Sequence, residues 1–157
     1  MNVTGRDDNQ QQRNMDIDHM SVRHDIDLAN QLIVTTWSGK ASDNDFIDAL
    51  TSYQQEIKGH LDYQLFNELL DFRHITDLNL STRGIIELSR IAQRSDQHEI
   101  QTRLAIVVSS TLAFGLAQMY ITYRNLVPNN NKKLRVFKSY DDAFDWLTTT
   151  VNSDQPH

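Results

Sequence analysis

The sequence predicts an α/β fold, a sandwich in which a mostly parallel sheet of about five strands is covered by about four helices. Apolar runs of strand length alternate with segments whose apolar residues recur every three or four positions, as in amphipathic helices. Strands separated by helices require right-handed crossovers and therefore a largely parallel sheet. The chain of 157 residues is long enough for one domain with a substantial core.

The amino-terminal part predicts a tail, a hairpin and a helix. Residues 1–19 are rich in Gln, Asn and Asp, and we expect them to be a disordered tail because they bury little apolar surface. Two strands, Ser21–Asp27 and Gln31–Ser38, are joined by a short connection and predict an antiparallel hairpin. Ser42 is placed to cap the first helix and Gly59 to end it. The apolar face of that helix holds Phe46, Leu50, Tyr53 and Ile57.

The central part predicts a strand, a helix and a buried strand. The third strand lies around Leu65–Phe72, and a polar turn follows it. Ser81 or Thr82 is placed to cap the second helix. The buried stripe of that helix holds Ile85, Leu88, Ile91 and Ala92. The apolar run Leu104–Ser110 predicts a strand that is covered on both faces.

The carboxyl-terminal part completes the alternation. A third helix is expected from about Thr111 to Arg124, with Ser109 or Ser110 placed to cap it, and a loop follows around Pro128. LRVFKS predicts the last strand, and Ser139 is placed to cap a final helix. The element order is therefore ββαβαβαβα. We expect one domain over residues 20–151 and a polar tail over 152–157.

The composition excludes several classes of function. With 15 Lys+Arg against 21 Asp+Glu, the net charge is −6, so the chain has no general attraction to nucleic acid or anionic membranes. The lack of cysteine excludes disulfides and thiol catalysis and fits a reducing compartment. No apolar run reaches the roughly 18 residues of a membrane span, and the first residues lack a secretory signal. We therefore expect a cytoplasmic protein. The six histidines show no metal-ligand spacing, so we expect neither a metal nor a cofactor.

Four segments, taken in order, resemble a known family. They are WSGKASDNDF at the start of the first helix, ELLDFR in the third strand, RLAIVVSSTLAFGLAQMY across the fourth strand and third helix, and RVFKSYDDAFDWL at the end. Together they resemble the SpoIIAA-like, or STAS-domain, family of small bacterial proteins of unknown role. The resemblance implies a SpoIIAA-like sandwich and a non-enzymatic regulatory module that acts through protein contacts.

The resemblance also implies a phosphorylation site after the third strand. In anti-sigma-factor antagonists of this fold, a serine in an Asp-Ser-Ser-Gly-like turn is phosphorylated there. In this chain Asn79 takes the place of the Asp and Leu80 that of the acceptor, so the acceptor hydroxyl is missing. A shift by one residue would put Ser81 in its place. The alternative, which the sequence favours, is that Ser81 accepts a backbone N–H as a helix cap.

Asp71, Arg73 and His74 form a candidate polar site at the end of the third strand. A carboxylate beside a histidine can orient it as a general base, which would suit a hydrolase using Asp71 and His74. No nucleophile is placed in the sequence to join them. The favoured alternative is that Asp71 is bound by backbone N–H groups or by Arg73.

The third helix is apolar around most of its circumference. Its apolar residues are Leu112, Phe114, Leu116, Ala117, Met119, Tyr120, Ile121 and Tyr123. A helix that packs on one sheet face needs an apolar arc of only about 100°. The excess predicts contact with a neighbouring helix, a second copy of the chain or an apolar ligand. Phe114, Tyr120 and Ile121 are the candidate ligand or dimer face.

Three functions follow from these observations. The first is a binding or regulatory module whose partner is another protein or a second copy of the chain. The second is a carrier or sensor of a small apolar or lipid-like ligand, which the likeness of the fold to CRAL-TRIO lipid-transfer domains implies. The third is the hydrolase. A deep pocket lined by side chains of the third helix would favour the second function.

Overall fold

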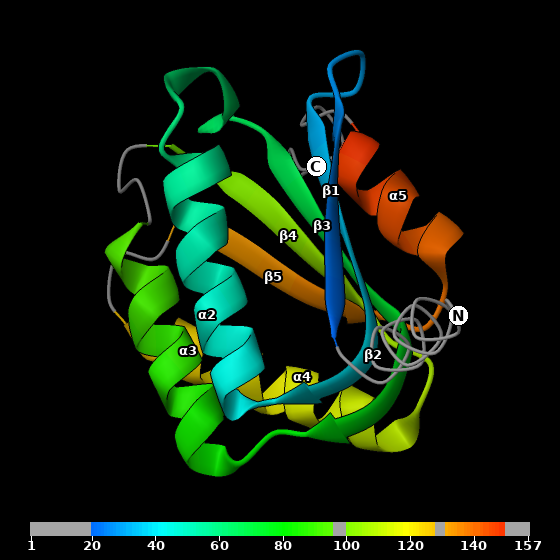
Figure 1. Ribbon diagram of the computed structural model, residues 1–157. Helices are drawn as coiled ribbons and strands as arrows, with labels where there is room; N and C mark the ends of the chain where they lie inside the picture. The colour runs from blue at the N-terminus through cyan, green and yellow to red at the C-terminus, as the bar shows by residue number, and fades with distance from the viewer. Residues whose placement is uncertain (1–19, 96–99, 128–130, 150–157) are drawn as a thin grey trace, which may run out of the picture.

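The structure, a computed structural model, describes residues 20–95, 100–127 and 131–149 (Figure 1). In chain order its elements are β1 (Ser21–Asp27), β2 (Leu32–Ser42), α2 (Asp43–Tyr53), the π-helical turn η1 (Gln54–Lys58), the 3₁₀ turn η2 (Leu61–Tyr63), β3 (Asn67–Asn79), α3 (Thr82–Arg94), β4 (Thr102–Val107), α4 (Thr111–Asn125), β5 (Lys132–Phe137) and α5 (Tyr140–Thr148). The predicted element order is confirmed. The two predicted tails lie outside the described residues.

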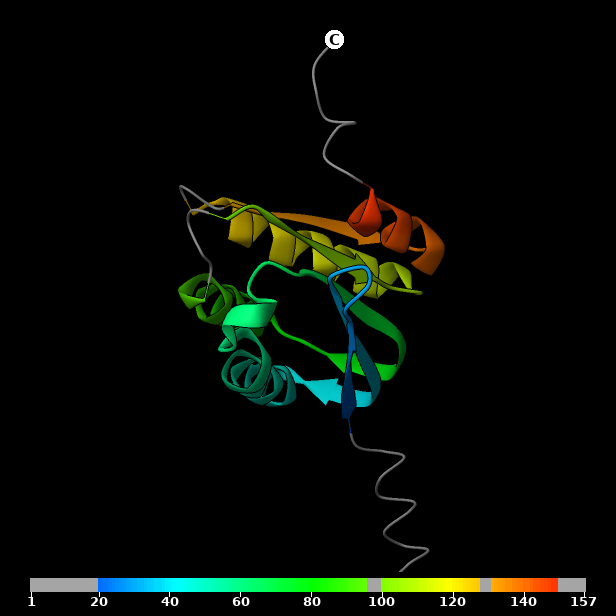
Figure 2. The same ribbon diagram turned by 90° about the horizontal axis from the view of Figure 1, so that it is seen from above.

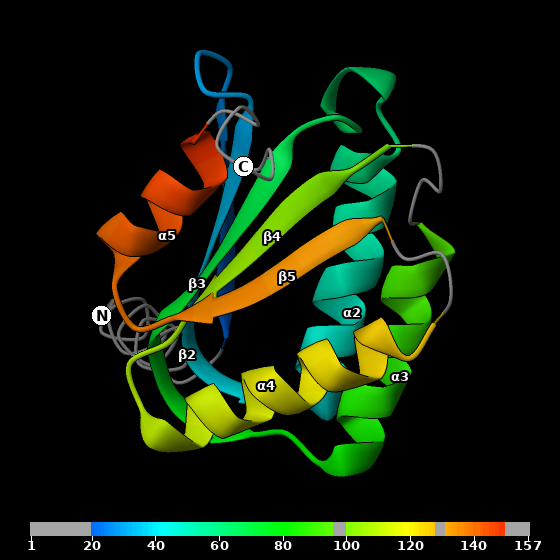
Figure 3. The same cartoon turned by 180° about the vertical axis from the view of Figure 1, so that it is seen from behind.

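The described strands form a mixed sheet in the order β1-β2-β3-β4-β5. β1 and β2 pair in antiparallel register, with Ser21 opposite Ser38 and Asp27 opposite Leu32, which confirms the predicted hairpin. The other neighbouring strands pair in parallel, as the intervening helices require. Figures 1 and 3 show the molecule from opposite sides, with β3 at the centre of the sheet.

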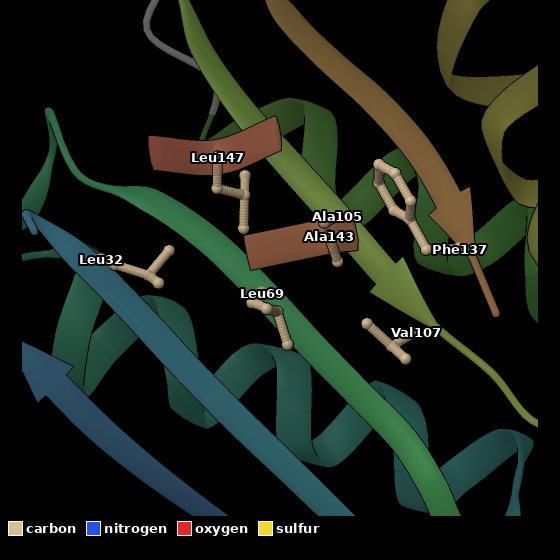
Figure 4. Packing of buried hydrophobic residues seen from close by; sticks show 7 residues of the cluster. All are labelled: Leu32, Leu69, Ala105, Val107, Phe137, Ala143 and Leu147. Carbon is tan, nitrogen blue, oxygen red and sulfur yellow. The ribbon is translucent and has the colours of Figure 1, made fainter. Parts of the chain in front are cut away.

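Helices cover both faces of the sheet. On one face α5 packs against the strands, and seven buried apolar residues gather there, among them Leu69, Ala105 and Leu147 (Figure 4). On the opposite face α4 covers β4 and β5, and α2 and α3 cover the end of β2. Figure 2 shows α5 on one side of the strands and the pair α2 and α3 on the other. The residues of β4 are therefore buried from both sides, as predicted.

β2 and β3 are longer than the sequence indicates. β3 continues to Asn79, so Asp71 and the residues after it lie within a strand, and the polar turn predicted after Phe72 is wrong. The reason is pairing, because β2 continues to Ser42, which lies opposite Asn79 in the parallel register. Register shifts accompany the extension, and Gly39 adopts φ 85°, a left-handed conformation that glycine accommodates.

Side-chain hydrogen bonds start the helices at the predicted residues. Ser81, Ser110 and Ser139 each accept a bond from the backbone N–H three residues later, at 3.0, 3.0 and 3.2 Å. Before α2, Ser42 donates its backbone N–H and its hydroxyl to Asp45 Oδ2 at 3.0 and 2.9 Å. Each such cap is worth about 1 kcal/mol, and together they fix where the helices meet the ends of the strands.

Candidate functional site

A cavity of about 380 Å³ lies between the sheet and helices α2, α3 and α4. This volume falls within the range of roughly 300–1,000 Å³ that is typical of small-molecule sites. Its apolar lining is Trp37, Phe46, Leu50, Leu70, Phe72, Ile75, Leu78, Leu80, Leu88, Ile106, Val108, Leu112, Ala113, Leu116, Ala117 and Tyr120. The size and the lining suit a small ligand that is mainly apolar.

Three aromatic rings form one wall of the cavity. Trp37 stacks on Phe46 with the ring centres 5.0 Å apart, and Phe72 meets these two rings edge-on at 5.2 and 5.8 Å. The contacts join β2, β3 and α2. Aromatic pairs of this geometry are worth about 0.5–1.5 kcal/mol each beyond their burial, so the wall is rigidly held.

α4 supplies another wall. Five of its residues line the cavity: Leu112, Ala113, Leu116, Ala117 and Tyr120. Ala113 and Ala117 have short side chains, which leave the space between α4 and the sheet unfilled. The wide apolar arc of α4 therefore has two roles within the chain. One part covers β4 and β5, and another part lines the cavity.

The structure separates the three residues of the candidate ligand or dimer face. Ile121 is buried in the cluster that α4 forms with β4 and β5, so it belongs to the core of the chain. Phe114 is half-buried against the same cluster, and Lys138 Nζ lies 5.4 Å from the centre of its ring. Tyr120 lines the cavity. Of the three, Tyr120 is placed to contact a ligand, and the dimer stays a prediction.

One end of the cavity is polar and exposed. It is lined by Thr76, Asp77, Ser109 and Ser110, beside Leu112, whose exposed fraction is 62%. We call this end the mouth. Ser109 and Ser110 follow β4 closely, so the mouth lies at the carboxyl end of a parallel strand. Open α/β sheets commonly bind ligands at this end of their strands.

A second hollow, of about 440 Å³, lies on the opposite face of the sheet beside α5. We call it the groove. Its lining is mostly polar and comes from β1, β2, β3 and the start of α5: Arg23, Asp25, Ile26, Asp27, Val34, Thr36, Asp71, Arg73, His74 and Tyr140. The groove thus brings together the three residues of the candidate polar site.

Within the groove, Asp71 is bound by Arg73 rather than by His74. Arg73 donates from Nε and Nη2 to the two carboxylate oxygens, both at 2.9 Å, and from its backbone N–H at 3.1 Å. Burial would raise the pKa of Asp71, but these hydrogen bonds outweigh it and lower the pKa. His74 Nε2 lies 3.9 Å from Asp71 Oδ2, beyond hydrogen-bond reach. The expected Asp71–Arg73 pair is confirmed.

The groove residues that carry a hydroxyl are Thr36 and Tyr140. The Arg73 guanidinium lies 4.9 Å from the centre of the Tyr140 ring. Burial, with the nearby charge of Asp71, raises the pKa of Tyr140, so its hydroxyl stays protonated. Nucleophilic catalysis needs a nucleophile within hydrogen-bond reach of its base. Neither Tyr140 nor Thr36, the hydroxyl residues of the groove, is hydrogen-bonded to His74 in the described part of the chain.

Glu68, which the sequence analysis missed, lies at the centre of a buried ionic cluster. Its Oε1 is 3.0 Å from Lys58 Nζ and 2.5 Å from Lys132 Nζ, and its Oε2 accepts a bond from the Tyr53 hydroxyl at 3.0 Å. Burial would raise the pKa of Glu68, but the two ammonium groups outweigh it and lower the pKa to about 2. Burial and the charge of Glu68 raise the pKa of Tyr53. The sequence did contain a signal, since Glu68 stands at the start of the apolar run of the third strand. A carboxylate that is buried with such a strand requires charged or hydrogen-bonding partners.

Ser81 caps α3 and is itself held by the first residue of α2. Its backbone N–H and its hydroxyl donate to the Asp43 carboxylate at 2.8 and 2.5 Å, and its Oγ accepts from the Gly84 N–H. The Asp43 carboxylate occupies the position that a Cβ atom on residue 84 would need. The predicted cap is confirmed, and phosphorylation of Ser81 stays a prediction.

The described residues contain neither a group of metal ligands nor a helix that could span a membrane. The part of the chain that the structure describes holds no group of three or more His, Asp or Glu side chains arranged to bind a metal ion. None of the described helices combines the length and the apolar character that crossing a bilayer requires. His24, one of the described histidines, is hydrogen-bonded to Thr35 Oγ1 at 2.8 Å.

The fold is shared with a solved structure. The chain is similar to an uncharacterized protein of the DUF3478 family with a SpoIIAA-like fold from Shewanella loihica PV-4, with a TM-score of 0.51 and 16% sequence identity. The similarity covers 82% of this chain and 93% of that chain. The fold is SpoIIAA-like. No protein-family model and no curated protein matches the chain. The SpoIIAA-like fold confirms the resemblance read from the sequence, and at this identity the likeness extends to the fold alone.

Proposed function

We propose that this SpoIIAA-like chain is a cytoplasmic, non-enzymatic binding module whose cavity takes a small apolar ligand. The observation that carries the proposal is the cavity of about 380 Å³, lined by aromatic and aliphatic side chains. Water in such a space finds few hydrogen-bond partners, and an apolar ligand that enters leaves bulk water, which is favourable. Of the three functions considered from the sequence, this is the carrier or sensor.

Two observations support a module without catalysis in a reducing compartment. Asp71, the carboxylate of the candidate hydrolase, is bound by Arg73, and His74 lies beyond hydrogen-bond reach of it. The sequence holds no cysteine, as is common where thiols are kept reduced. Regulation would follow if an occupied cavity changed the surface that the surrounding helices present to a partner.

Ligand entry can be measured through Trp37. The chain has two tryptophans, and Trp146 lies on the opposite face of the sheet, 5.6 Å from the Phe137 ring. Trp146→Phe leaves Trp37, in the cavity wall, as the single tryptophan reporter. Titration of this variant with an uncharged apolar dye, N-phenyl-1-naphthylamine, should quench Trp37 and brighten the dye.

Two variants of α4 form a matched pair. Ala113→Phe places a ring in the cavity and should weaken dye binding at least about tenfold. Gly115→Phe adds the same ring two residues later, where nothing lies within 4 Å of an added Cβ, and should keep the wild-type affinity. Equal dye binding by Ala113→Phe and the wild type would place the dye outside the cavity and overturn the proposal.

A protein partner is the second candidate, and exposed leucines on and beside α4 favour it. The exposed fractions of Leu112 and Leu126 are 62% and 70%. A second copy of the chain that covers them would form a symmetric dimer. Leu126→Asp should turn such a dimer into a folded monomer on size-exclusion chromatography with light scattering, whereas Phe114→Asp should also lower stability because Phe114 is half-buried. A wild type that is monomeric at high concentration would exclude the dimer.

A further inference from the structure

We propose that the ligand is an amphiphile whose polar head donates hydrogen bonds, an alcohol or an amine rather than a carboxylate, and that this head lies at the mouth beside Asp77. The inference rests on the proposed function, because it concerns the ligand of the same cavity. It follows from where the polar and charged groups of the lining are placed.

The polar groups of the lining are concentrated at one end. Thr76, Asp77, Ser109 and Ser110 all lie at the mouth and are exposed. Towards the interior the lining is apolar apart from the Tyr120 hydroxyl and the indole of Trp37. The Trp37 nitrogen is covered by neighbouring atoms and makes no hydrogen bond among the described residues, so it does not reach the cavity surface. A polar head would lose its hydration in the interior, which places the apolar tail inside and the head at the mouth.

The charge of the mouth decides which head is accepted. Among the described lining residues Asp77 is the acidic one, and none of them is Lys, Arg or His. Lys40 lies opposite Asp77 in the sheet register, but Asp77 lines the cavity and Lys40 does not. An alcohol or an amine can donate to the Asp77 carboxylate and to the hydroxyl oxygens around it. A carboxylate head would instead meet a like charge.

The amino terminus of α4 also lies at the mouth and acts in the opposite sense. A helix amino terminus carries a partial charge of roughly +0.5, which attracts anions. Ser110 Oγ already accepts one of the first-turn N–H groups, from Ala113, at 3.0 Å. The full negative charge of Asp77 exceeds the remaining partial charge, so the balance at the mouth favours a donor head over an anionic one.

Three probes with the same tail test the head. Decanol, decylamine and decanoate should be titrated at low salt into the Trp146→Phe variant of the full chain, with Trp37 fluorescence and calorimetry as readouts. Decanol and decylamine should bind about tenfold more tightly than decanoate, the size of effect that one nearby charge gives close to a protein surface. Raising the salt concentration should reduce the preference of decylamine over decanoate but leave decanol binding unchanged.

Charge reversal at the mouth should invert the preference between the two charged probes. Asp77→Lys should bind decanoate more tightly than decylamine, and it should weaken decanol less than decylamine because the hydroxyl groups of the mouth can still accept from an alcohol. Asp62→Lys is the matched control, because it changes the net charge equally on exposed η2, before the start of β3 rather than near its end. It should keep the wild-type order.

The outcomes separate this inference from the function on which it rests. If the neutral dye binds, but decanoate binds as tightly as decanol and Asp77→Lys changes neither, the head lies elsewhere and the inference is overturned while the cavity function stands. If neither the dye nor any of the three amphiphiles binds, the proposed function itself fails. Inversion by Asp77→Lys, and not by Asp62→Lys, establishes the head at the mouth.

Discussion

The two faces of β3 differ in the side chains that they present and in the kind of hollow that these side chains line. Leu70 and Phe72 point to the helices on one face and line the cavity, whereas Asp71 and Arg73 point to the other face and line the groove. In the groove the carboxylate of Asp71 and the guanidinium of Arg73 bind each other through two hydrogen bonds. In the cavity, rigid rings and short alanines leave a volume that no side chain fills. The same strand thus borders an apolar hollow on one face and an ion pair on the other.

The buried carboxylates of β3 extend this comparison. Glu68 and Asp71 are both almost fully buried, with side-chain exposed fractions of 4%. Glu68 has two lysine partners whose side chains are themselves 11% and 14% exposed, whereas Asp71 has one arginine that is 38% exposed. Removing the first carboxylate takes the opposite charge away from two largely buried lysines, whereas removing the second affects one arginine that can turn to water. The following predictions test that difference.

Glu68→Gln should give the largest loss of stability, roughly 3–5 kcal/mol, because the largely buried ammonium groups of Lys58 and Lys132 would lose the carboxylate charge that lies beside them. Chemical denaturation at neutral pH measures this. The folded pKa of Glu68 is about 2, below its ordinary value of 4.5, so its contribution is present above pH 4.5 and is lost as the pH falls towards 2. The variant should lack this part of the acid sensitivity. Wild-type stability in the variant would show that the cluster is not coupled to folding.

Asp71→Asn should cost less, about 2 kcal/mol, since the Arg73 side chain is partly exposed and water can replace some of the lost bonds. The pKa of Asp71 is lowered, so its contribution is also present at neutral pH and is lost as the pH falls below its ordinary value of 3.8. Dye binding in the cavity should be unchanged, because Asp71 faces the groove. A loss of dye affinity in this variant would mean that the two faces of β3 are coupled.

Ser81→Ala should have the smallest effect, about 1 kcal/mol from loss of a helix cap. Ser81 follows the end of β3 and lines neither hollow, so the variant gives a baseline for the other two. Thermal denaturation measures the change, and Ser81→Thr is the comparison that keeps a hydroxyl able to accept from the Gly84 N–H and to donate to Asp43. Detection of phosphoserine at position 81 in cells would support the phosphorylation hypothesis and show that the hydroxyl has a use beyond capping.

Local chemistry explains which parts of the fold could be predicted from the sequence. The caps at Ser81, Ser110 and Ser139 depend on residues three positions apart, and the buried strand β4 is read from one continuous apolar run. The extension of β3 to Asn79 depends instead on pairing with β2, which is far away in the sequence. The residues of this extension are mostly polar and therefore resemble a turn. Non-local pairing of this kind leaves no signal in a short window.

The candidate site was predictable only in part, for the same reason. The excess of apolar surface on the third helix was visible, and Tyr120, one of the predicted ligand candidates, lines the cavity. Which part of that surface meets the core was not visible, because it depends on how α4 is turned against β4 and β5, and Ile121 proved to face the core. The cavity exists because the side chains of several elements do not fill the volume that these elements enclose. It therefore depends on all of these elements together. The partners of Glu68, on η1 and at the start of β5, are likewise brought together only by the fold.

The contact between Asp43 and the start of α3 also bears on how this fold can vary between species. The Asp43 carboxylate accepts hydrogen bonds from the Ser81 N–H and hydroxyl, and it lies where the Cβ of any other residue at position 84 would be. Glycine at position 84 therefore leaves room for the acidic side chain at position 43. A Cβ added at position 84 alone would displace the Asp43 carboxylate and break its two hydrogen bonds to Ser81, whereas loss of the acid at 43 creates no clash. In an alignment of homologues these two positions should therefore change together: chains that have lost the acid at 43 are free to carry alanine or serine at 84, and chains that keep it retain glycine.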